Sequence, residues 1–522
     1  MTARGQCWTC CLHQVLCDGR KPICERCETC SLECLGYGGG VWQGADDTNQ
    51  PTKPPLPDAI VQSPTPSLYR RAQMIFEGLD YFNKLISPNV VSDASHFNPY
   101  IVNLKRLESF PDHYIKVLVA TAGFHRLMTA GPEPTSSALI QRDIDIFALR
   151  SEALGALNDQ LAHPGTQTSD ATLLTVVALL ITSMQSSAHT EWRAHLEGAR
   201  RIIQLRGGLK KIIRYNPYFK PILIYFIMAD VMGATTCSSK HDNMPVASLM
   251  ALKYWEIEPN ILRLLAATPN PCPEDVFQSI ILINYLRTIS RDGKLRKRRQ
   301  SGTRMVLDKI LRFSPTEYAA RMHNFTGWKP NGKDVGFANS PDESQPLPPG
   351  SGSQRGGSSS ESPSSADSPS DQDLWLSVAA VYRAAALIYG LRTLVVDSED
   401  DDTTLLLPEE VTDVAALREE ACQTLTDTLT PVFSDQDTMY RIGKLVMWPL
   451  FILGMEVHHR DLAQRKFFVD GFAMLSRMMG VLGPIGAIDE LTHKWALDSE
   501  RTEGSRVAWD DYFEGRPDYI VF

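Results

Sequence analysis

The chain has 522 residues, of which 43% are hydrophobic and 22% are charged, and its formal net charge at pH 7 is −9. This length exceeds one ordinary domain, and the composition is that of a folded globular protein rather than a disordered one. The negative net charge excludes a protein that is basic throughout, so any DNA-binding surface has to be local.

Cysteines are concentrated at the start of the chain, where eight of the eleven fall between Cys7 and Cys34. Six of them form a repeat in which the spacing Cys-x2-Cys-x6-Cys occurs twice, and these six are Cys7, Cys10, Cys17, Cys24, Cys27 and Cys34. No basic segment followed by an apolar one opens the chain as a secretion signal does. Outside an oxidising compartment, dense cysteines are typical of metal ligands rather than disulfides.

Six thiolates match the needs of two zinc ions. A structural zinc ion takes four ligands, so two ions need eight zinc–sulfur bonds. Six thiolates supply eight bonds only if two of them bridge both ions, and the equivalent positions of the repeat, Cys7 and Cys24, are the candidates. The alternative is two independent four-cysteine sites that also use Cys11 and Cys30. Because the segment has few apolar residues, we expect it to depend on zinc for folding.

The cysteine block resembles the fungal zinc binuclear-cluster DNA-binding module, with further matches at Cys17-Asp18, Pro22-x-Cys24 and Cys34-x-Gly36-Tyr37-Gly38. The resemblance implies two zinc ions held by the six cysteines of the repeat. It also implies binding to a CGG-like triplet of double-stranded DNA through the major groove, and a nuclear regulator of RNA polymerase II transcription.

The segment that carries most DNA contacts in that family is unusual here. It is crowded with Arg and Lys in the family, whereas this chain reads Cys-Leu-His-Gln-Val-Leu over residues 11–16. Phosphate neutralisation supplies most non-specific DNA affinity, so the lack of basic residues is a deficit. We assign the candidate DNA contacts to His13, Gln14, Arg20 and Lys21, of which Gln14 suits pairing with adenine. The alternative is a folded zinc module that has lost direct DNA binding and acts through protein–protein interaction.

Composition divides the chain into five segments. These are the zinc module (1–43), a Pro-rich linker (44–67), the first part of a helical regulatory domain (68–329), a disordered low-complexity insertion rich in Ser and Gly (330–373), and the second part of the helical domain (374–522). Few segments alternate with period two, so the predicted fold class is mostly all-α. The linker has no sustained heptad pattern, which leaves both a monomer and a homodimer open.

Three helices are marked by their apolar stripes and end signals. The first carries Trp192, Leu196, Ala199, Ile202 and Ile203 and stops at Gly207-Gly208. The second has Pro408 at its first position, Glu409 and Glu410 at its positive end, and a stripe of Val411, Val414, Leu425 and Leu429. The third carries Phe468, Phe472, Leu475, Met479 and Leu482 and ends at Gly483-Pro484.

Two apolar stretches, Leu173–Met184 and Ile222–Ala229, are shorter than the ~18 residues that a membrane span needs. We therefore expect buried core helices and no membrane partner.

Two motifs of the body resemble the fungal-specific transcription factor domain that follows such zinc modules. They are Trp192-x-x-His195-Leu196-x-Gly198-Ala199 with Gly207-Gly208, and the run Trp-Pro-Leu-Phe-Ile-Leu-Gly-Met-Glu over 448–456. This resemblance implies a regulatory helical body whose partners are the transcription machinery or co-regulators. No catalytic motif is present in the sequence, and we expect no enzyme activity.

Two charged segments each allow two interpretations. The basic run 294–299 is either a nuclear import signal or a solvated helix end. The run Trp509-Asp510-Asp511-Tyr512-Phe513-Glu514 mixes acids with aromatics, so it is either an activation segment or a tail docked on the helical body.

Overall fold

The computed structural model describes residues 18–20, 24–29, 66–92, 98–129, 137–186, 191–241, 243–257, 261–289, 294–322, 371–397, 403–500, 507–517 and 519–521. Over these residues every regular element is a helix and no strand occurs. The predicted mostly all-α fold is therefore confirmed for this part of the chain. The chain divides into two compact units, Met1–Glu77 and Gly78–Phe522.

The first unit contains the short helix α2 (Glu25–Thr29) and most of α3 (Pro66–Tyr81). The second unit is built from longer helices. Those of its first half are α4 (Asp112–Thr129), α5 (Ser137–Ala162), α6 (Asp170–Ser186), α7 (Glu191–Leu205), α8 (Leu209–Tyr215), α9 (Lys220–Thr235) and α10 (Met244–Ala251).

The helices of the second half are α11 (Glu274–Thr288), α12 (Lys294–Arg312), α13 (Pro315–Met322), α14 (Asp371–Gly390), α15 (Val414–Ser434), α16 (Gln436–Ile442), α17 (Met447–Glu456), α18 (Leu462–Met479), α19 (Gly483–Glu500) and α20 (Trp509–Phe513). Short 3-10 and π segments join them, namely η1 (Phe82–Ile86), η2 (Ser87–Val90), η3 (Leu104–Ser109), η4 (Pro217–Phe219), η5 (Tyr254–Glu256), η6 (Ile261–Ala267), η7 (Leu391–Val396), η8 (Thr403–Leu406) and η9 (Gly443–Val446).

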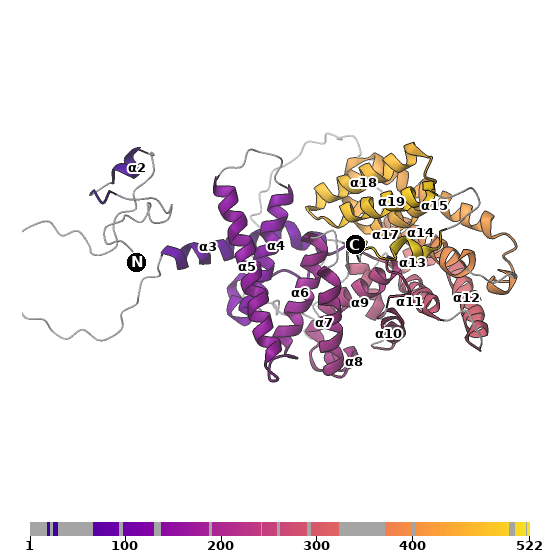
Figure 1. The fold of residues 1–522 in the computed structure, drawn as a ribbon, viewed down its shortest axis with the longest axis horizontal. Helices are drawn as coiled ribbons and strands as arrows, with labels where there is room; N and C mark the ends of the chain where they lie inside the picture. The colour runs from indigo at the N-terminus through magenta and orange to yellow at the C-terminus, as the bar shows by residue number, and fades with distance from the viewer. Residues whose placement is uncertain are drawn as a thin grey trace, which may run out of the picture. The chain divides into compact units, whose positions relative to one another are not determined.

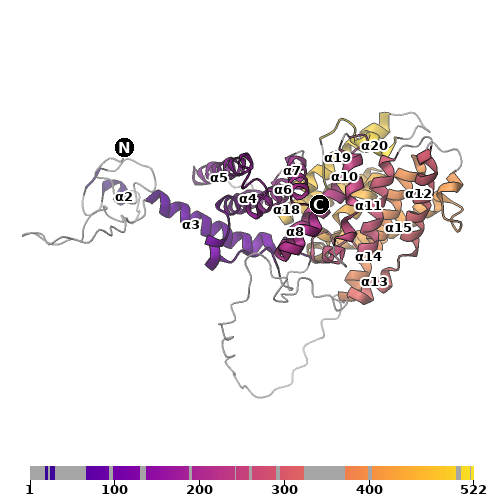
Figure 2. The ribbon, with the colours of Figure 1, turned by 90° about the horizontal axis from the view of Figure 1, so that it is seen from below.

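Within the second unit, α4 packs against α5 and α6, and α6 packs against α7. Helix α14 contacts α11, α12, α13, α15 and α17 in the other half. Figure 1 shows α4 and α5 at one end of this unit and α12 and α15 at the other (Figure 1). The last long helices return to the first ones, because α18 contacts α4 and α19 contacts α6. The same order of helices can be followed from below in Figure 2.

Helix α9 contacts α6, α7 and α10 of the first half and α11 of the second half. Residues 221–233 are all buried, and such a helix shows no amphipathic stripe because every face meets protein. Helix α17 is of the same kind, since residues 447–455 are buried. These two helices form the centre of the core.

In the part of the chain that the structure describes, two helices, Pro217–Thr235 and Asp373–Val396, are long and apolar enough to cross a bilayer by length and composition alone. The expectation that the apolar stretch around Ile222–Ala229 is too short for a span was therefore wrong, because the helix extends past it on both sides. Within their apolar windows, 78% and 67% of the residues are buried inside the fold. Burial of this extent is what a core helix requires, and we interpret both as core helices.

The helix predicted from Trp192 to Ile203 is confirmed as α7, and all five stripe residues are buried. The chain leaves it through two consecutive glycines with left-handed backbone, Gly207 (φ +89°) and Gly208 (φ +93°). The amide of Gly208 donates to the carbonyl of Ile203 at 2.9 Å, which satisfies one of the carbonyls left open at the helix end.

The other two helix boundaries differ from prediction. Helix α15 begins at Val414 and not at Pro408, because the Asp413 carboxylate caps it by accepting from the amides of Ala415 (2.8 Å) and Ala416 (3.0 Å). Val411 therefore lies outside the helix. Helix α18 ends at Met479, three residues before the expected stop, because Gly480 adopts left-handed backbone with φ +63°.

The close contact of α9 with α7 at Gly233 gives a test of the core. A Cβ atom at this position would lie 2.5 Å from Cη2 of the buried Trp192 ring. We expect Gly233→Ala to destabilise the protein by about 1–3 kcal/mol, because a rigid ring has to move. Gly155→Ala in α5, where a Cβ meets nothing within 4 Å, should be neutral or stabilising by up to ~1 kcal/mol. Urea unfolding of both variants measures the difference, and equal stability would contradict the packing described.

Candidate functional site

The described part of the cysteine block is organised by the carboxylate of Asp18. Its Oδ1 accepts from the amide of Glu25 at 3.0 Å, and its Oδ2 accepts from the amide of Arg20 at 3.2 Å. The carboxylate thereby caps the start of α2, which begins directly after Cys24. The thiol-bearing residue Cys24 is fully buried. Asp18 thus fixes the backbone that presents Cys24 and Cys27, residues that bracket the first turn of α2.

Most of the predicted site residues lie outside the described part of the chain. The structure places Cys24, Arg20 and the backbone of Cys27. Those outside the described residues are Cys7, Cys10, Cys17, Cys34, His13, Gln14 and Lys21. Among the residues that are described, no three His, Cys, Asp or Glu side chains lie close enough together to hold a metal ion. A buried cysteine at the start of a capped helix is a donor of the kind that zinc uses.

Arg20, one of the candidate DNA contacts, forms an ion pair with Glu28 of α2. Both side chains are more than half exposed, so the pair adds little stability. The pair does change the local charge, because the Glu28 carboxylate partly neutralises Arg20, one of the few cations of this segment.

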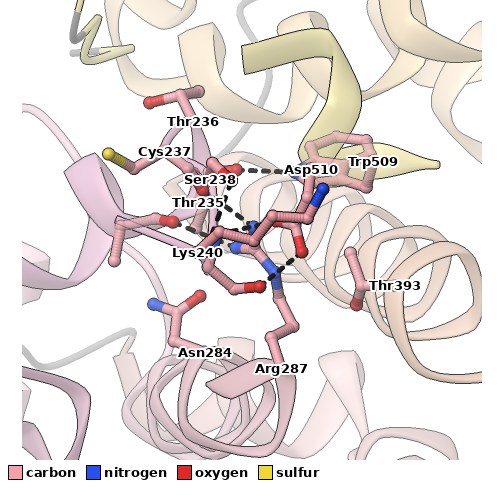
Figure 3. A network of polar contacts seen from close by, with 12 residues as sticks. Thr235, Thr236, Cys237, Ser238, Lys240, Asn284, Arg287, Thr393, Trp509 and Asp510 are labelled. Carbon is pink, nitrogen blue, oxygen red and sulfur yellow. Dashed lines mark hydrogen bonds and ion pairs between the residues drawn. The ribbon is translucent and has the colours of Figure 1, made fainter. Parts of the chain in front are cut away.

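A second polar cluster lies inside the body, at the carboxyl end of α9 (Figure 3). The last carbonyls of a helix have no partner within the helix and need donors when they are buried. The guanidinium of Arg287, from α11, donates to the carbonyl of Ala234 at 3.0 Å and to that of Cys237 at 2.8 Å. A cation at this end of the helix also opposes the partial negative charge of the helix dipole.

Arg287 is itself held by an acid from the end of the chain. It forms an ion pair with Asp510 of α20, and Asp510 also accepts from the amide of Ser239 at 2.9 Å. Burial alone would raise the pKa of Asp510, but Arg287 and Ser239 outweigh it and lower that pKa. Burial would lower the pKa of Arg287, yet the Tyr389 hydroxyl and Asp510 outweigh it and raise that pKa. The two groups are therefore charged at neutral pH.

Further donors extend this cluster to α14 and α17. The indole of Trp509 donates to the carbonyl of Thr235 at 2.8 Å. The indole of Trp448 donates to the hydroxyl of the same Thr235 at 3.0 Å. The hydroxyl of Tyr389 donates to Asn284 at 2.6 Å, and the amide of Asn284 donates to the carbonyl of Val231 at 2.9 Å. Figure 3 labels Thr235, Asn284 and Trp509 of this group around the end of α9.

The acidic and aromatic run near the chain end is docked on the body. Trp509, Tyr512 and Phe513 are buried, and Asp510 faces Arg287. The exposed Lys240 pairs with Asp511 (3.4 Å) and Glu514 (2.8 Å). The aromatic side chains are thus occupied in the core, and the structure supports the docked interpretation of this run over an activation segment.

The basic run 294–299 lies at the start of α12 and is divided between surface and core. Residues 295–298 are exposed. Arg299 is buried, and its guanidinium reaches the carbonyl of Leu394 at 3.5 Å. Exposure of residues 295–298 fits both the nuclear import signal and the solvated helix end, whereas Arg299 belongs to the packing of α12 on η7.

Sequence reasoning missed the roles of Arg287 and of a second buried arginine, Arg200, which pairs with Asp230 of α9. A signal was present for the latter pair, because Asp230 interrupts an otherwise apolar run from Pro221 to Gly233. A buried acid of this kind needs a cation or a set of donors.

The profile of the family described as "Fungal specific transcription factor domain" matches residues 78–522, the whole of the second compact unit. The phomenoic acid biosynthesis cluster-specific transcriptional regulator of Leptosphaeria maculans is 22% identical over 517 residues, which cover 94% of this chain and 86% of that protein. The pestheic acid cluster transcriptional regulator 3 of Pestalotiopsis fici is 47% identical over 36 residues, or 7% of this chain and 6% of that protein. No solved structure matches the chain.

The Arg287–Asp510 pair makes a prediction about stability and its pH dependence. Asp510→Asn leaves a buried arginine without its counter-ion, and we expect a loss of about 3 kcal/mol in the free energy of unfolding at pH 7. Because folding lowers the pKa of Asp510, its contribution is complete above the unfolded-state pKa of about 3.9 and is lost as the pH falls below it. Denaturant unfolding from pH 7 to pH 3 measures this dependence.

The neighbouring Asp511→Asn is the matched control, because Asp511 pairs with the exposed Lys240 and should cost less than about 1 kcal/mol at any pH. A loss of equal size in both variants would contradict the role given to Asp510.

Proposed function

Because the chain belongs to the fungal-specific transcription factor domain family, we propose that it is a nuclear, zinc-dependent transcription regulator that binds double-stranded DNA through its N-terminal module. The family profile accounts for residues 78–522, which leaves the cysteine repeat as the part that would contact DNA. The similarity to the Leptosphaeria maculans regulator covers 94% of this chain, more than residues 78–522 contain. The single observation that carries the proposal is the duplicated cysteine spacing ahead of a regulator body.

We assign the zinc ligands to the six cysteines of the repeat, Cys7, Cys10, Cys17, Cys24, Cys27 and Cys34. When bound, two zinc ions would hold these thiolates together and replace the apolar core that so short a segment lacks. The contribution of the chain itself is the capped helix α2, which fixes where Cys24 stands.

DNA recognition is assigned to His13, Gln14, Arg20 and Lys21, with a CGG-like triplet as the target that the family resemblance implies. Arg20 and Lys21 would contact phosphates, which sets position and affinity. Gln14 suits the edge of adenine in the major groove, and His13 becomes a stronger donor when protonated. With so few cations, we expect weak non-specific affinity and a shallow dependence on salt.

A second function, protein–protein interaction without direct DNA binding, is favoured by one observation. Arg20 is paired with Glu28, so the basic surface of the module is reduced further. In this alternative, the zinc module serves as a folded scaffold, and the helical body recruits the transcription machinery or co-regulators.

The targets that we propose are the genes of a biosynthetic cluster. Both similar proteins carry names that describe them as regulators of such clusters, one for phomenoic acid and one for pestheic acid. The proposal rests on these names and on the length of the alignment to the first.

Zinc content is the first test of the module. We expect the purified full chain to hold two zinc ions, measured by plasma mass spectrometry, and Cys24→Ser to lose zinc because a bridging ligand is removed. Cys422→Ser, in α15 of the body, is the matched control and should keep both ions. The double variant Cys11→Ser/Cys30→Ser should also keep both, and loss of zinc there would favour two independent four-cysteine sites. A wild-type chain without zinc would contradict the assignment.

DNA binding is tested on the full chain with a randomised duplex pool at several salt concentrations. We expect enrichment of a CGG-like motif and an affinity that falls as salt rises. Arg20→Ala should lower the slope of log K against log salt by about one, whereas Glu28→Gln should raise the affinity by relieving Arg20 of its carboxylate. A chain that holds two zinc ions but enriches no sequence at low salt would instead support the protein-interaction alternative.

A further inference from the structure

A pocket with a volume of about 320 Å³ lies among α7, α8, α9, α10 and η5 of the body. Its buried floor is apolar apart from one cluster of charged groups, and the apolar residues of this floor are Ile203, Leu209, Phe226 and Ile257. Pockets of this size, apolar with a few fixed polar groups, are typical of small-molecule sites. It is separate from the Arg287 cluster, because it uses residues from the first half of α9.

The polar part of the floor is the guanidinium of Arg200. It forms ion pairs with Glu197 on its own helix and with Asp230 of α9, and the hydroxyl of Tyr254 donates to Asp230. These contacts fix the plane of the guanidinium. The side chain of Arg200 is only 7% exposed, and its Nε has no hydrogen-bond partner among the described residues. That atom is closed to solvent, so Arg200 contributes the charge of its fixed guanidinium to the floor and not a free donor.

The rim of the pocket carries an excess of positive charge. Lys210 and Lys253 are exposed there, against one acid, Glu256. Neither lysine forms an ion pair in the described part of the chain, so both are available to a bound anion. Exposed cations at the mouth of an apolar pocket attract anions and hold them by charge-assisted hydrogen bonds.

We propose that this pocket binds a small organic acid, with its apolar part on Phe226 and the neighbouring aliphatic side chains and its anionic group between Lys210 and Lys253. The inference goes beyond the proposed function, because binding here requires neither zinc nor DNA. A ligand in this position contacts both the α7–α8 pair and the α9–α10 pair, so it is placed to act as an effector of the body.

Two fluorescent probes that differ in one group test the proposal on the full chain. The first is 1-anilinonaphthalene-8-sulfonate, an aromatic anion, and the second is N-phenyl-1-naphthylamine, the same rings without the sulfonate. We expect the anion to bind about tenfold more tightly than the neutral probe, because charge-assisted hydrogen bonds form only with the sulfonate.

The double variant Lys210→Ala/Lys253→Ala should raise the Kd of the anionic probe about tenfold and leave that of the neutral probe unchanged. Both lysines are exposed, so the fold should be retained. The control, Lys84→Ala/Lys466→Ala, removes the same charge from exposed sites elsewhere and should change neither Kd.

Gln204→Trp at the exposed rim should block both probes by filling the mouth of the pocket. Equal affinity for the two probes, an anion Kd unaffected by the lysine substitutions, or binding unaffected by Gln204→Trp would each overturn the proposal. None of these results depends on zinc or DNA, so failure here is distinguishable from failure of the proposed function.

Discussion

A helix that is apolar on every side, such as α9, has to end inside the protein, and the carbonyls of its last turn then need donors that the helix does not contain. Arg287 and Trp509 supply them. A buried arginine needs a counter-ion in turn, and Asp510 provides it. The burial of one helix end thereby determines the positions of α11, α14, α17 and the last segment of the chain. Removing any one donor leaves buried polar groups unsatisfied, so the cluster behaves as a unit.

Local patterns in the sequence were sufficient to predict some helices and their boundaries but not others. Helix α7 was predictable because its stripe and its two glycines lie within one stretch of chain. The start of α15 was missed because Asp413 is a better cap than Pro408 is a first residue, and both are followed by helix-compatible sequence. Helix α9 gives no periodic signal, and the Arg287–Asp510 pair joins residues more than 200 positions apart. No local rule identifies such a pair.

The features of the candidate sites also divide into those that the sequence predicts and those that only the structure shows. The cysteine spacing is a one-dimensional signal, so the six zinc ligands were proposed from sequence alone. The role of Asp18 as the cap of α2, and the pairing of Arg20 with Glu28, required coordinates. The pocket around Arg200 has no sequence motif, because α7, α8, α9 and α10 each contribute only a few of its residues. In the sequence, the pocket is indicated by Asp230, an acid that lies within an apolar run and pairs with Arg200.

The order in which the cluster at the end of α9 is assembled has a consequence for biosynthesis. Trp509 and Asp510 leave the ribosome after every helix that they contact, whereas domains begin to fold during synthesis, N-terminal parts first. The core therefore carries unsatisfied carbonyls and an unpaired arginine until residues 509 and 510 have been made. A product that stops before residue 509 keeps this defect permanently and exposes the apolar surface that Trp509, Tyr512 and Phe513 cover. Chaperones and proteases would thus distinguish chains that stop before residue 509 from chains that contain residues 509–513 by the state of a single helix end.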